Sequence, residues 1–477
     1  MSPSKVTTID FNSFHNIVDG KPRSSKTYYH GIDPSTKQNL WEVPVASKQD
    51  LDDAVSAAQR AFSSWSTTTI EERREKLKSF SELIQSHTDE LTDLLVQEAG
   101  KPRLMAGGEV GVASKFISHH TKLDIPEEKF EDDEKEIYTR YIPMGVVGAI
   151  CPWNFPILLA GKIAPALITG NCIIVKPSPY TPYTALKIAE IGQQVFPPGV
   201  LQVLGGDDKI GPWITMHPGI QKISFTGSIA TGKKVAEACA KTLKRVTLEL
   251  GGNDASIVLP DVDVQATAPS VAMGAFMNSG QVCVASKRIY VHESIYQDFL
   301  AAMSAFVTKT LKVGPGNETG VMIGPIQNEM QYEKVKGFFG DSAKQGHKFT
   351  VGGPVQKTDG YFIHPTIVDN PPNESRIITE EPFGPIVPVQ PWTDEAEVIR
   401  RANETNTGLG ACVWSKDVKH AREIAEQLQA GSVFINSFAK PVPEAFFSGH
   451  KESGVGGEWG PHGMLSYCNA RAIHIYK

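Results

Sequence analysis

The sequence predicts an α/β protein built on open, mainly parallel β-sheets. From residue 144 onward, short apolar runs alternate with segments at helical spacing, in the order strand, helix, strand, helix. This order is typical of a parallel sheet covered by helices. The chain has 477 residues, which predicts two or three domains with large cores.

The segment before residue 144 is predicted to contain one long helical stretch. Residues 1–49 contain two strand-like pieces and are expected to pack on the surface. Apolar residues recur at helical spacing over 50–98, and Ser47 could cap the first helix. Residues 121–143 are strongly charged and predict either an exposed hairpin leading into a strand or a solvated loop.

Two α/β units follow. The first has strand-like runs at 144–150, 172–176, 200–204 and 222–225, and helical segments at 156–169, 182–195, 210–217 and 229–243. The second is expected to start near Arg245, with strand-like runs at 246–250, 255–259, 288–291, 386–389, 411–414 and 432–435. Its helical segments are 262–277, 296–311, 327–345, 394–404 and 418–430. A last strand-like run lies at 472–476. Left unpaired, it would be an exposed edge strand, so we expect it to pair with another strand.

The composition argues against several classes of protein. The net charge is −6 and no long Lys/Arg run is present, so we expect no nucleic-acid partner. The six cysteines are scattered without a CxxC pair, which argues against a zinc site or a disulfide scaffold and predicts no metal. Without an apolar signal segment near Met1, we expect a cytoplasmic protein. Lys162 and Pro165 interrupt the apolar run 157–175, which favours a buried helix and strand over a membrane span.

Cofactor candidates follow the predicted strands, because ligands of open α/β sheets bind beyond the carboxyl ends of the strands. Gly227 and Ser228 follow a strand and open a helix, where backbone N–H groups could hold a pyrophosphate. The pattern is not a full GxGxxG and is weak alone. Lys176 ends a strand, and its ammonium either reaches the surface or binds a ribose.

Three residues are catalytic candidates. Cys283 ends the turn NSGQVC, where it is either a loop nucleophile or a small buried side chain. Glu249 ends an apolar strand before two glycines. It is either a general base whose pKa is raised by burial or one partner in a structural ion pair. Asn154, shortly before Pro156, is either an oxyanion donor or a helix cap.

Taken together, six motifs resemble those of the aldehyde dehydrogenase superfamily. They are PWNFP at 152–156, FTGS at 225–228, LELGG at 248–252, NSGQVC at 278–283, EPFGP at 381–385 and KxSGxG at 451–456. The motifs stand in family order and at family spacing, and the resemblance covers nearly the whole chain.

The resemblance implies a non-phosphorylating oxidation of an aldehyde to the acid with NAD or NADP. Cys283 would form a thiohemiacetal and then a thioester. Asn154 and the backbone N–H of Cys283 would hold the oxyanion, and Glu249 would activate the hydrolytic water. Lys162 and Glu458 match positions linked to proton exit. Cofactor contacts are implied for Trp153, Lys176, Ser178, Phe225, Gly227, Ser228, Leu250, Glu381 and Phe383.

The family fold has two Rossmann-like open α/β domains and a small β oligomerisation arm. It implies an NAD(P)-binding domain at 1–120 and 144–247, a catalytic domain at 248–445, and an arm at 121–143 and 451–477. The arm would give the tail strand a partner in a neighbouring subunit, in a homodimer or a homotetramer. Gly457 stands where many relatives carry an Arg near a subunit contact, which leaves the choice between dimer and tetramer open.

Some residues depart from the family pattern, and two rival functions stay open. Pro179 stands where many relatives have a Glu that binds the adenosine ribose, which predicts that NADP is used alongside NAD. A CoA-acylating dehydrogenase usually lacks the base that Glu249 supplies, and a non-catalytic binding protein would not need the catalytic set. The aldehyde itself is not specified. An apolar or aromatic substrate is suggested by Phe155, Val282, Val284 and Phe438.

Overall fold

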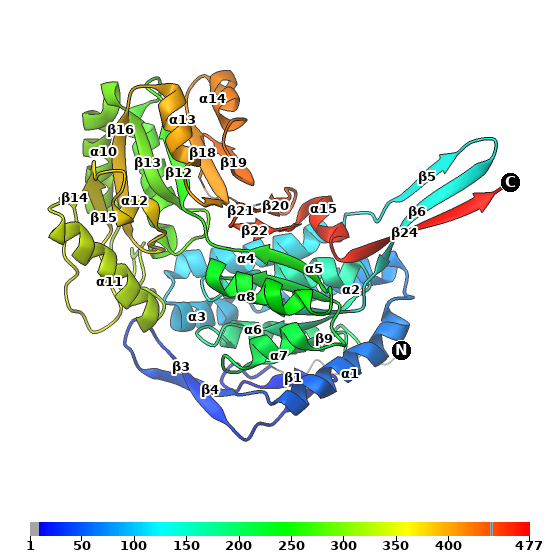
Figure 1. Cartoon of the computed structure of the whole chain (residues 1–477). Coiled ribbons are helices and arrows are strands. Elements are labelled where there is room, and N and C mark those ends of the chain that lie inside the picture. Colours follow the sequence, from blue (N-terminus) through cyan, green and yellow to red (C-terminus); the bar gives the residue numbers. More distant parts are fainter. Residues whose placement is uncertain (1–8, 439, 441) are drawn as a thin grey trace.

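A computed structural model describes residues 9–438, 440 and 442–477. Over these residues the chain forms two α/β units side by side and a narrow arm that projects from the first unit (Figure 1). The predicted α/β class is therefore confirmed. The first eight residues of the expected surface segment lie outside the described residues.

The first unit contains an eight-stranded sheet within the described residues. Its order is β2 (Lys21–Arg23), β1 (Asn16–Val18), β9 (Leu201–Val203), β8 (Cys172–Lys176), β7 (Val146–Ile150), β10 (Lys222–Thr226), β11 (Arg245–Glu249) and β22 (Gly454–Val455). The strands from β9 to β11 are parallel, and β1 and β22 join them antiparallel. The central strands are buried because helices cover both faces.

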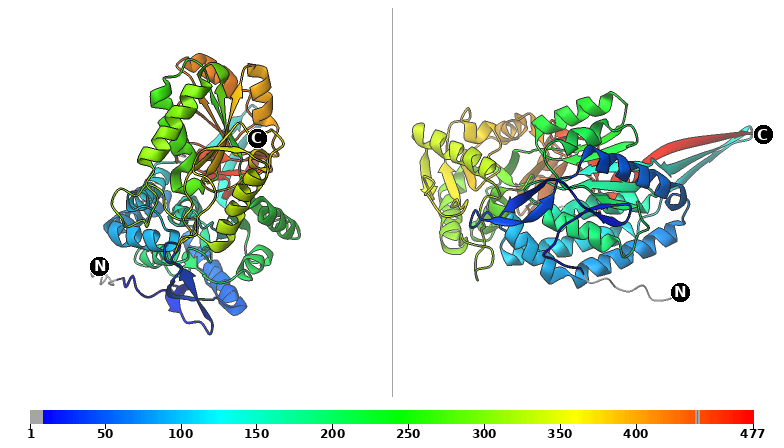
Figure 2. Two further views of the ribbon diagram at one scale, coloured as in Figure 1. Left: turned by 90° about the vertical axis from the view of Figure 1, so that its left-hand side faces the viewer. Right: turned by 90° about the horizontal axis from the view of Figure 1, so that it is seen from below.

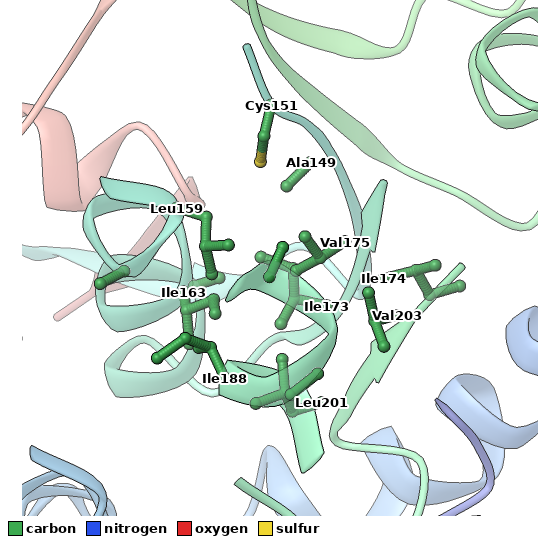
Figure 3. Packing of buried hydrophobic residues seen from close by; sticks show 14 of the residues in the cluster. Ala149, Cys151, Leu159, Ile163, Ile173, Ile174, Val175, Ile188, Leu201 and Val203 are labelled. Carbon is green, nitrogen blue, oxygen red and sulfur yellow. The ribbon is translucent and has the colours of Figure 1, made fainter. Parts of the chain in front are cut away.

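Helices surround this sheet. They are α1 (Lys48–Trp65), α2 (Ile70–Ser86), α3 (Thr88–Ala99), α4 (Arg103–His120), the 3-10 turn η1 (Pro156–Leu159), α5 (Ala160–Ile168), α6 (Tyr183–Gly192), α7 (Ile210–Met216) and α8 (Ile229–Ala240). Figure 3 shows how Ile163 and Ile188 pack against Ile173 and Leu201 of the sheet. This core holds the carboxyl ends of the strands in fixed positions.

The second unit contains a seven-stranded sheet among the described residues. Its order is β14 (Lys348–Val351), β15 (Thr366–Asp369), β16 (Ile386–Trp392), β13 (Ser286–His292), β12 (Asp254–Val258), β18 (Gly410–Trp414) and β19 (Ser432–Ile435). All neighbours are parallel except β14 and β15. Its helical elements are α9 (Val264–Phe276), η2 (Met277–Gly280), η3 (Glu293–Ile295), α10 (Tyr296–Thr310), α11 (Glu329–Lys344), α12 (Arg376–Thr379), α13 (Glu395–Asn403) and α14 (Val418–Ala425).

The projecting arm is a three-stranded antiparallel sheet. Its order is β24 (Cys468–Tyr476), β6 (Lys135–Pro143) and β5 (Glu127–Glu131), and it extends away from both units (Figure 2). The remaining elements are the pairs β3 (Tyr28–Ile32) with β4 (Asn39–Pro44), β17 (Thr407–Gly408) with β21 (His450–Lys451), and β20 (Phe447–Ser448) with β23 (Gly457–Glu458), and the helix α15 (Gly460–Leu465).

The structure corrects where the second unit begins. The run 246–250 was expected to open the second unit, but β11 pairs in parallel with β10 of the first sheet. An apolar run does not say which sheet it joins, so the sequence could not decide this. The register sets Thr226 beside Glu249. Glu249 therefore ends a strand of the first sheet, whereas Cys283 belongs to the second unit.

The arm and the N-terminal helices can now be compared with the expectations. The tail strand β24 pairs along its whole length with β6 of the same chain, and its outer edge has no partner among the described residues, so a partner strand in a neighbouring subunit stays a prediction. The helical stretch 50–98 is divided among α1, α2 and α3, and Ser47 caps α1 as expected. The sequence analysis missed α4, because three glycines weaken its helical signal. No helix in the described part of the chain is long and apolar enough to cross a membrane.

Candidate active site

The turn that carries Cys283 has an unusual backbone. Asn278, Ser279 and Gly280 have φ values of 52°, 59° and 71°, which is the left-handed region. A Cβ at Gly280 would lie 2.2 Å from the carbonyl oxygen of Gly384, so this position requires glycine. Cys283 follows on a loop and is half-buried, whereas the other five cysteines are buried. The expectation of a loop cysteine is confirmed.

Cys283 and Glu249 meet across the junction of the two units. The thiol of Cys283 donates to Glu249 Oε1 at 3.4 Å, and the hydroxyl of Thr226 donates to Glu249 Oε2 at 3.1 Å. In the part of the chain that the structure describes, no Lys or Arg forms an ion pair with Glu249, so the ion-pair interpretation is not supported. The carboxylate is placed to accept a proton from the thiol or from a water beside it.

Burial shifts the pKa values of both groups upward. Desolvation is the main cause of the raised pKa of Glu249, and the charge of Lys162 opposes it. The pKa of Cys283 is raised well above its ordinary value by burial first and by the Glu249 charge second, and the Lys287 charge opposes this rise. The resting site therefore holds a thiol, and an acceptor for its proton is in contact with it.

Asn154 holds the same turn from the first unit. Its side-chain amide donates to the carbonyl of Gln281 at 3.1 Å, and Asn278 donates to the Asn154 carbonyl at 3.2 Å. The 3-10 turn η1 has no side-chain cap, so the alternative role of Asn154 as a helix cap is not seen. The Asn154 amide thus bonds to the residue two positions before Cys283, which brings an N–H donor to the turn where an oxyanion would form.

Lys162 and Glu458 belong to a buried polar network behind the catalytic pair. Lys162 Nζ donates to Ser224 Oγ at 2.7 Å and lies 3.4 Å from Glu458 Oε1. Ser224 also donates to Glu458, and the Tyr467 hydroxyl donates to Glu458 Oε2 at 3.0 Å. The structure thus brings together both residues that the resemblance linked to proton exit.

Ser224 and Tyr467 are members of this network that no sequence motif indicated, whereas Thr226 stands in the FTGS motif after a predicted strand. Ser224 and Thr226 are two positions apart on β10, so their side chains lie on one face of the strand. The signal was available in the polar residues at every second position from Lys222 to Thr226. It was overlooked because the run was considered only as a buried strand.

The proposed cofactor contacts surround the carboxyl ends of the first sheet. Lys176 is 6% exposed, and its Nζ has no hydrogen-bond partner or ion pair among the described residues. Burial lowers the pKa of this ammonium, and the nearby charges of Asp208 and Asp207 oppose the shift. The nitrogen keeps some contact with solvent and has no acceptor in the described part of the chain, so it is free to donate to a ligand hydroxyl. The rings of Trp153 and Phe383 meet edge to face at 5.4 Å.

Other predicted cofactor residues have structural contacts. Gly227 precedes α8, and the Ser228 hydroxyl accepts the Thr231 N–H at the start of that helix. The hydroxyl of Ser178 accepts the N–H of Tyr180 at 3.3 Å. The Leu250 side chain lies against Gly232, and the Phe225 ring lies against Gly227. These contacts shape the end of the sheet, and a role of these residues in binding a cofactor stays a prediction.

The residues named as substrate candidates lie in one apolar cluster around Cys283. Val282 and Val284 are buried in it, and Phe155 and Phe438 pack against it. The sequence analysis did not name three aromatic members, which are Phe116, Phe447 and Trp459. The Phe447 and Trp459 rings stack at 4.8 Å, and Phe116 meets Trp459 edge to face at 4.6 Å. They come from distant segments, so their proximity appears only in the fold.

Comparisons with known proteins agree with this arrangement. A family model described as the aldehyde dehydrogenase family matches residues 21–473. Aldehyde dehydrogenase LUC3 of Fusarium sp is 45% identical over 98% of this chain and 100% of that protein. The solved NAD+ complex of an aldehyde dehydrogenase from Bacillus cereus has a TM-score of 0.94 at 32% identity, covering 97% of this chain and 96% of that one. An NADP-dependent enzyme from E. coli has a TM-score of 0.95 at 32% identity, covering 98% and 99%.

We predict that Glu249→Gln makes Cys283 more reactive toward iodoacetamide at neutral pH. Removing the adjacent negative charge favours the thiolate, so the pKa of the thiol falls and alkylation at pH 7 speeds up by roughly threefold to tenfold. The measurement is the alkylation rate against pH, followed by intact mass. Cys283→Ala is the control and should remove the reactive site. A slower or unchanged rate would contradict the effect of the Glu249 charge.

Proposed function

The chain belongs to the aldehyde dehydrogenase family, and on this premise we propose that it oxidises an aldehyde to the carboxylic acid with NAD or NADP through a thioester on Cys283. The observation that carries the proposal is the 3.4 Å contact between Cys283 Sγ and Glu249 Oε1 beside the Asn154 amide. When bound, a nicotinamide cofactor supplies the hydride acceptor.

The residues divide the chemistry as follows. The Cys283 thiolate adds to the carbonyl carbon after its proton passes to Glu249, or to water in a variant that lacks this base. The Asn154 amide and the Cys283 N–H hold the oxyanion of the thiohemiacetal. Glu249 releases the first proton before hydrolysis. After loss of the hydride leaves a thioester, Glu249 takes a proton from water, the resulting hydroxide displaces the sulfur as a thiolate to give the acid, and the sulfur regains a proton from Glu249. Lys162 and Glu458 lie behind Glu249 and could return its proton to solvent.

Three features of the site support binding of the cofactor. Lys176 offers an unpaired buried ammonium to a ribose, and Glu381 is one-fifth exposed at the edge of the site. The start of α8 offers backbone N–H groups to a pyrophosphate. Trp153 and Phe383 would border the nicotinamide. NAD+ in the Bacillus cereus neighbour and the NADP dependence of the E. coli neighbour support use of either cofactor.

The substrate we propose is an apolar or aromatic aldehyde. The side chains around Cys283 are aromatic or aliphatic, which favours a substrate of the same kind. Lys101 lies 3.8 Å from the centre of the Phe155 ring, but its charge is already matched by the buried carboxylate of Glu109. A substrate carboxylate would therefore find no free cation at Lys101, which disfavours short acidic aldehydes.

We also propose that the arm joins copies of the chain in a homo-oligomer. The arm exposes apolar side chains that a second copy could cover, namely Phe130, Ile473, Ile475 and Tyr476. The outer edge of β24 has no partner strand among the described residues. A free edge with apolar side chains is normally covered in a native protein.

Glu249→Gln is expected to trap the acyl-enzyme. The first turnover should give a burst of NAD(P)H, after which the steady rate falls by roughly 10²–10⁴-fold because water is no longer activated. Intact mass spectrometry should show one acyl group, and Cys283→Ala should show neither burst nor adduct. Cys239→Ala, at another cysteine, should keep both burst and turnover. Acid formation by the parent enzyme only when CoA is present would favour the acylating alternative.

Pro179→Glu is expected to restrict the enzyme to NAD+. A carboxylate near the ribose site repels a 2′-phosphate, so kcat/KM with NADP+ should fall at least about tenfold while that with NAD+ changes little. Pro179→Gln is the matched control, because it changes the size without adding a charge. Steady-state kinetics with both cofactors give the result. A parent enzyme that strongly prefers NAD+ would contradict the role of Pro179.

The double variant Ile473→Glu with Ile475→Glu is expected to dissociate the oligomer. Two charges on the face of β24 that we expect to be covered would be desolvated in the contact, which is strongly unfavourable. Sedimentation velocity should show the mass of a single chain for the variant and a multiple of it for the parent. His474→Glu, which points to the other face of β24, is the control. A monomeric parent protein would refute the proposal.

A further inference from the structure

Lys287 is a buried cation that the catalytic scheme above does not use. It lies in β13, directly after Cys283 and its turn, and is 2% exposed. Its ammonium donates to the carbonyl oxygens of Val282 at 2.7 Å and Cys283 at 2.9 Å. The third contact is with Glu381 Oε1 at 2.8 Å. All three N–H bonds of the ammonium are therefore used.

The same cation adjoins two of the residues proposed as cofactor contacts, Phe383 and Glu381. Lys287 Nζ lies 5.5 Å from the centre of the Phe383 ring. Glu381 Oε1 accepts from Lys287 and also from the N–H of Gly252 at 3.3 Å. Glu381 Oε2 receives no hydrogen bond from the described residues, so it remains open to a ligand donor such as a ribose hydroxyl.

We propose that Lys287 is a positioning residue that couples the cofactor site to the nucleophile. It fixes the Cys283 carbonyl and the Glu381 carboxylate in a single arrangement, so that binding at Glu381 and the ionisation of Cys283 influence each other. The inference rests on the proposed function, because it takes Glu381 as a cofactor contact and Cys283 as the nucleophile.

The charges around Cys283 determine whether the coupling favours the thiol or the thiolate. Glu249 faces the thiol from β11, Asp254 from β12 and Lys287 from β13. Both carboxylates disfavour the thiolate, whereas Lys287 favours it. Burial raises the pKa of Asp254 to about 8, so Asp254 is mostly uncharged at neutral pH. The balance at the thiol therefore lies mainly between Glu249 and Lys287.

Cofactor binding should shift this balance toward the thiolate. Glu381 partly neutralises Lys287 in the free enzyme. Hydroxyl donors on Oε2 would stabilise the carboxylate and draw its charge away from Oε1, leaving more of the ammonium's field for Cys283. Loss of the ammonium would have the opposite effect, because Glu381 would lose its partner and the two carbonyls a donor.

The test compares Lys287→Met, Lys287→Arg and a buried-lysine control. Met keeps an apolar chain without the charge, and Arg keeps the charge. Lys187→Met is the control, because Lys187 is also fully buried and pairs with Glu190 in α6, away from Cys283 in the chain. Two readouts need no turnover. They are the pH dependence of Cys283 alkylation by iodoacetamide, with and without NAD+, and the NAD+ dissociation constant from protein fluorescence.

We expect Lys287→Met to slow alkylation at pH 7.5 at least about tenfold, as a rise of one unit in the pKa of the thiol would do. The NAD+ dissociation constant should rise by a similar factor, and NAD+ should no longer change the alkylation rate. Lys287→Arg should recover part of each effect, and Lys187→Met should change none. An alkylation profile and an NAD+ affinity like those of the parent enzyme would overturn the proposal.

If Lys287→Met has a structural defect, a double-variant measurement of NAD+ affinity still tests the proposal. Circular dichroism and thermal unfolding reveal such a defect, and Lys287→Arg is then combined with Glu381→Gln. Coupled residues give non-additive changes in NAD+ affinity, whereas additive changes would overturn the proposal. A parent enzyme without NAD(P)-dependent aldehyde oxidation would instead refute the proposed function. The alkylation profiles would still measure the effect of Lys287 on the pKa of the Cys283 thiol.

Discussion

The parallel register of β10 against β11 is the constraint on which the site depends. It places Thr226 beside Glu249 at the carboxyl end of the first sheet, where Cys283 approaches from the second unit. A shift of one residue would turn Glu249 to the other face of the sheet. The same register aligns Ser224 with Lys162 and Glu458 behind the catalytic pair. One strand pairing thus positions both the base and the polar network that adjoins it.

Buried charge is the second organising feature. Lys162 pairs with Glu458, Lys101 with Glu109, and Lys287 with Glu381, which offsets part of the cost of removing each ammonium from water. Lys176 is equally buried but has no such partner among the described residues. The contrast indicates a place for a ligand, because an ammonium without a protein acceptor is free to donate to a ligand hydroxyl.

The sequence predicted what is encoded locally. The turn before Cys283, the strand that ends in Glu249 and the helix after Gly227 each follow from a short pattern of glycine, apolar and polar residues. What it missed depends on how the segments pair and pack in three dimensions. No local pattern says that β11 joins the first sheet, that Tyr467 folds back to Glu458, or that Phe116 meets Trp459. The role of Lys287 also escapes a local pattern, since its partner Glu381 lies far along the chain.

Glu249 meets two opposing demands. It must be ionised to accept a proton, yet its charge disfavours the Cys283 thiolate. Their direct contact resolves this, because moving the proton from sulfur to carboxylate leaves the pair with one negative charge before and after. Lys162 favours that single charge on Glu249 and Lys287 favours it on Cys283, so the buried site need not accommodate a second anion. Attack on the aldehyde then carries the negative charge from sulfur toward the oxygen beside the Asn154 amide, which a preorganised donor can stabilise.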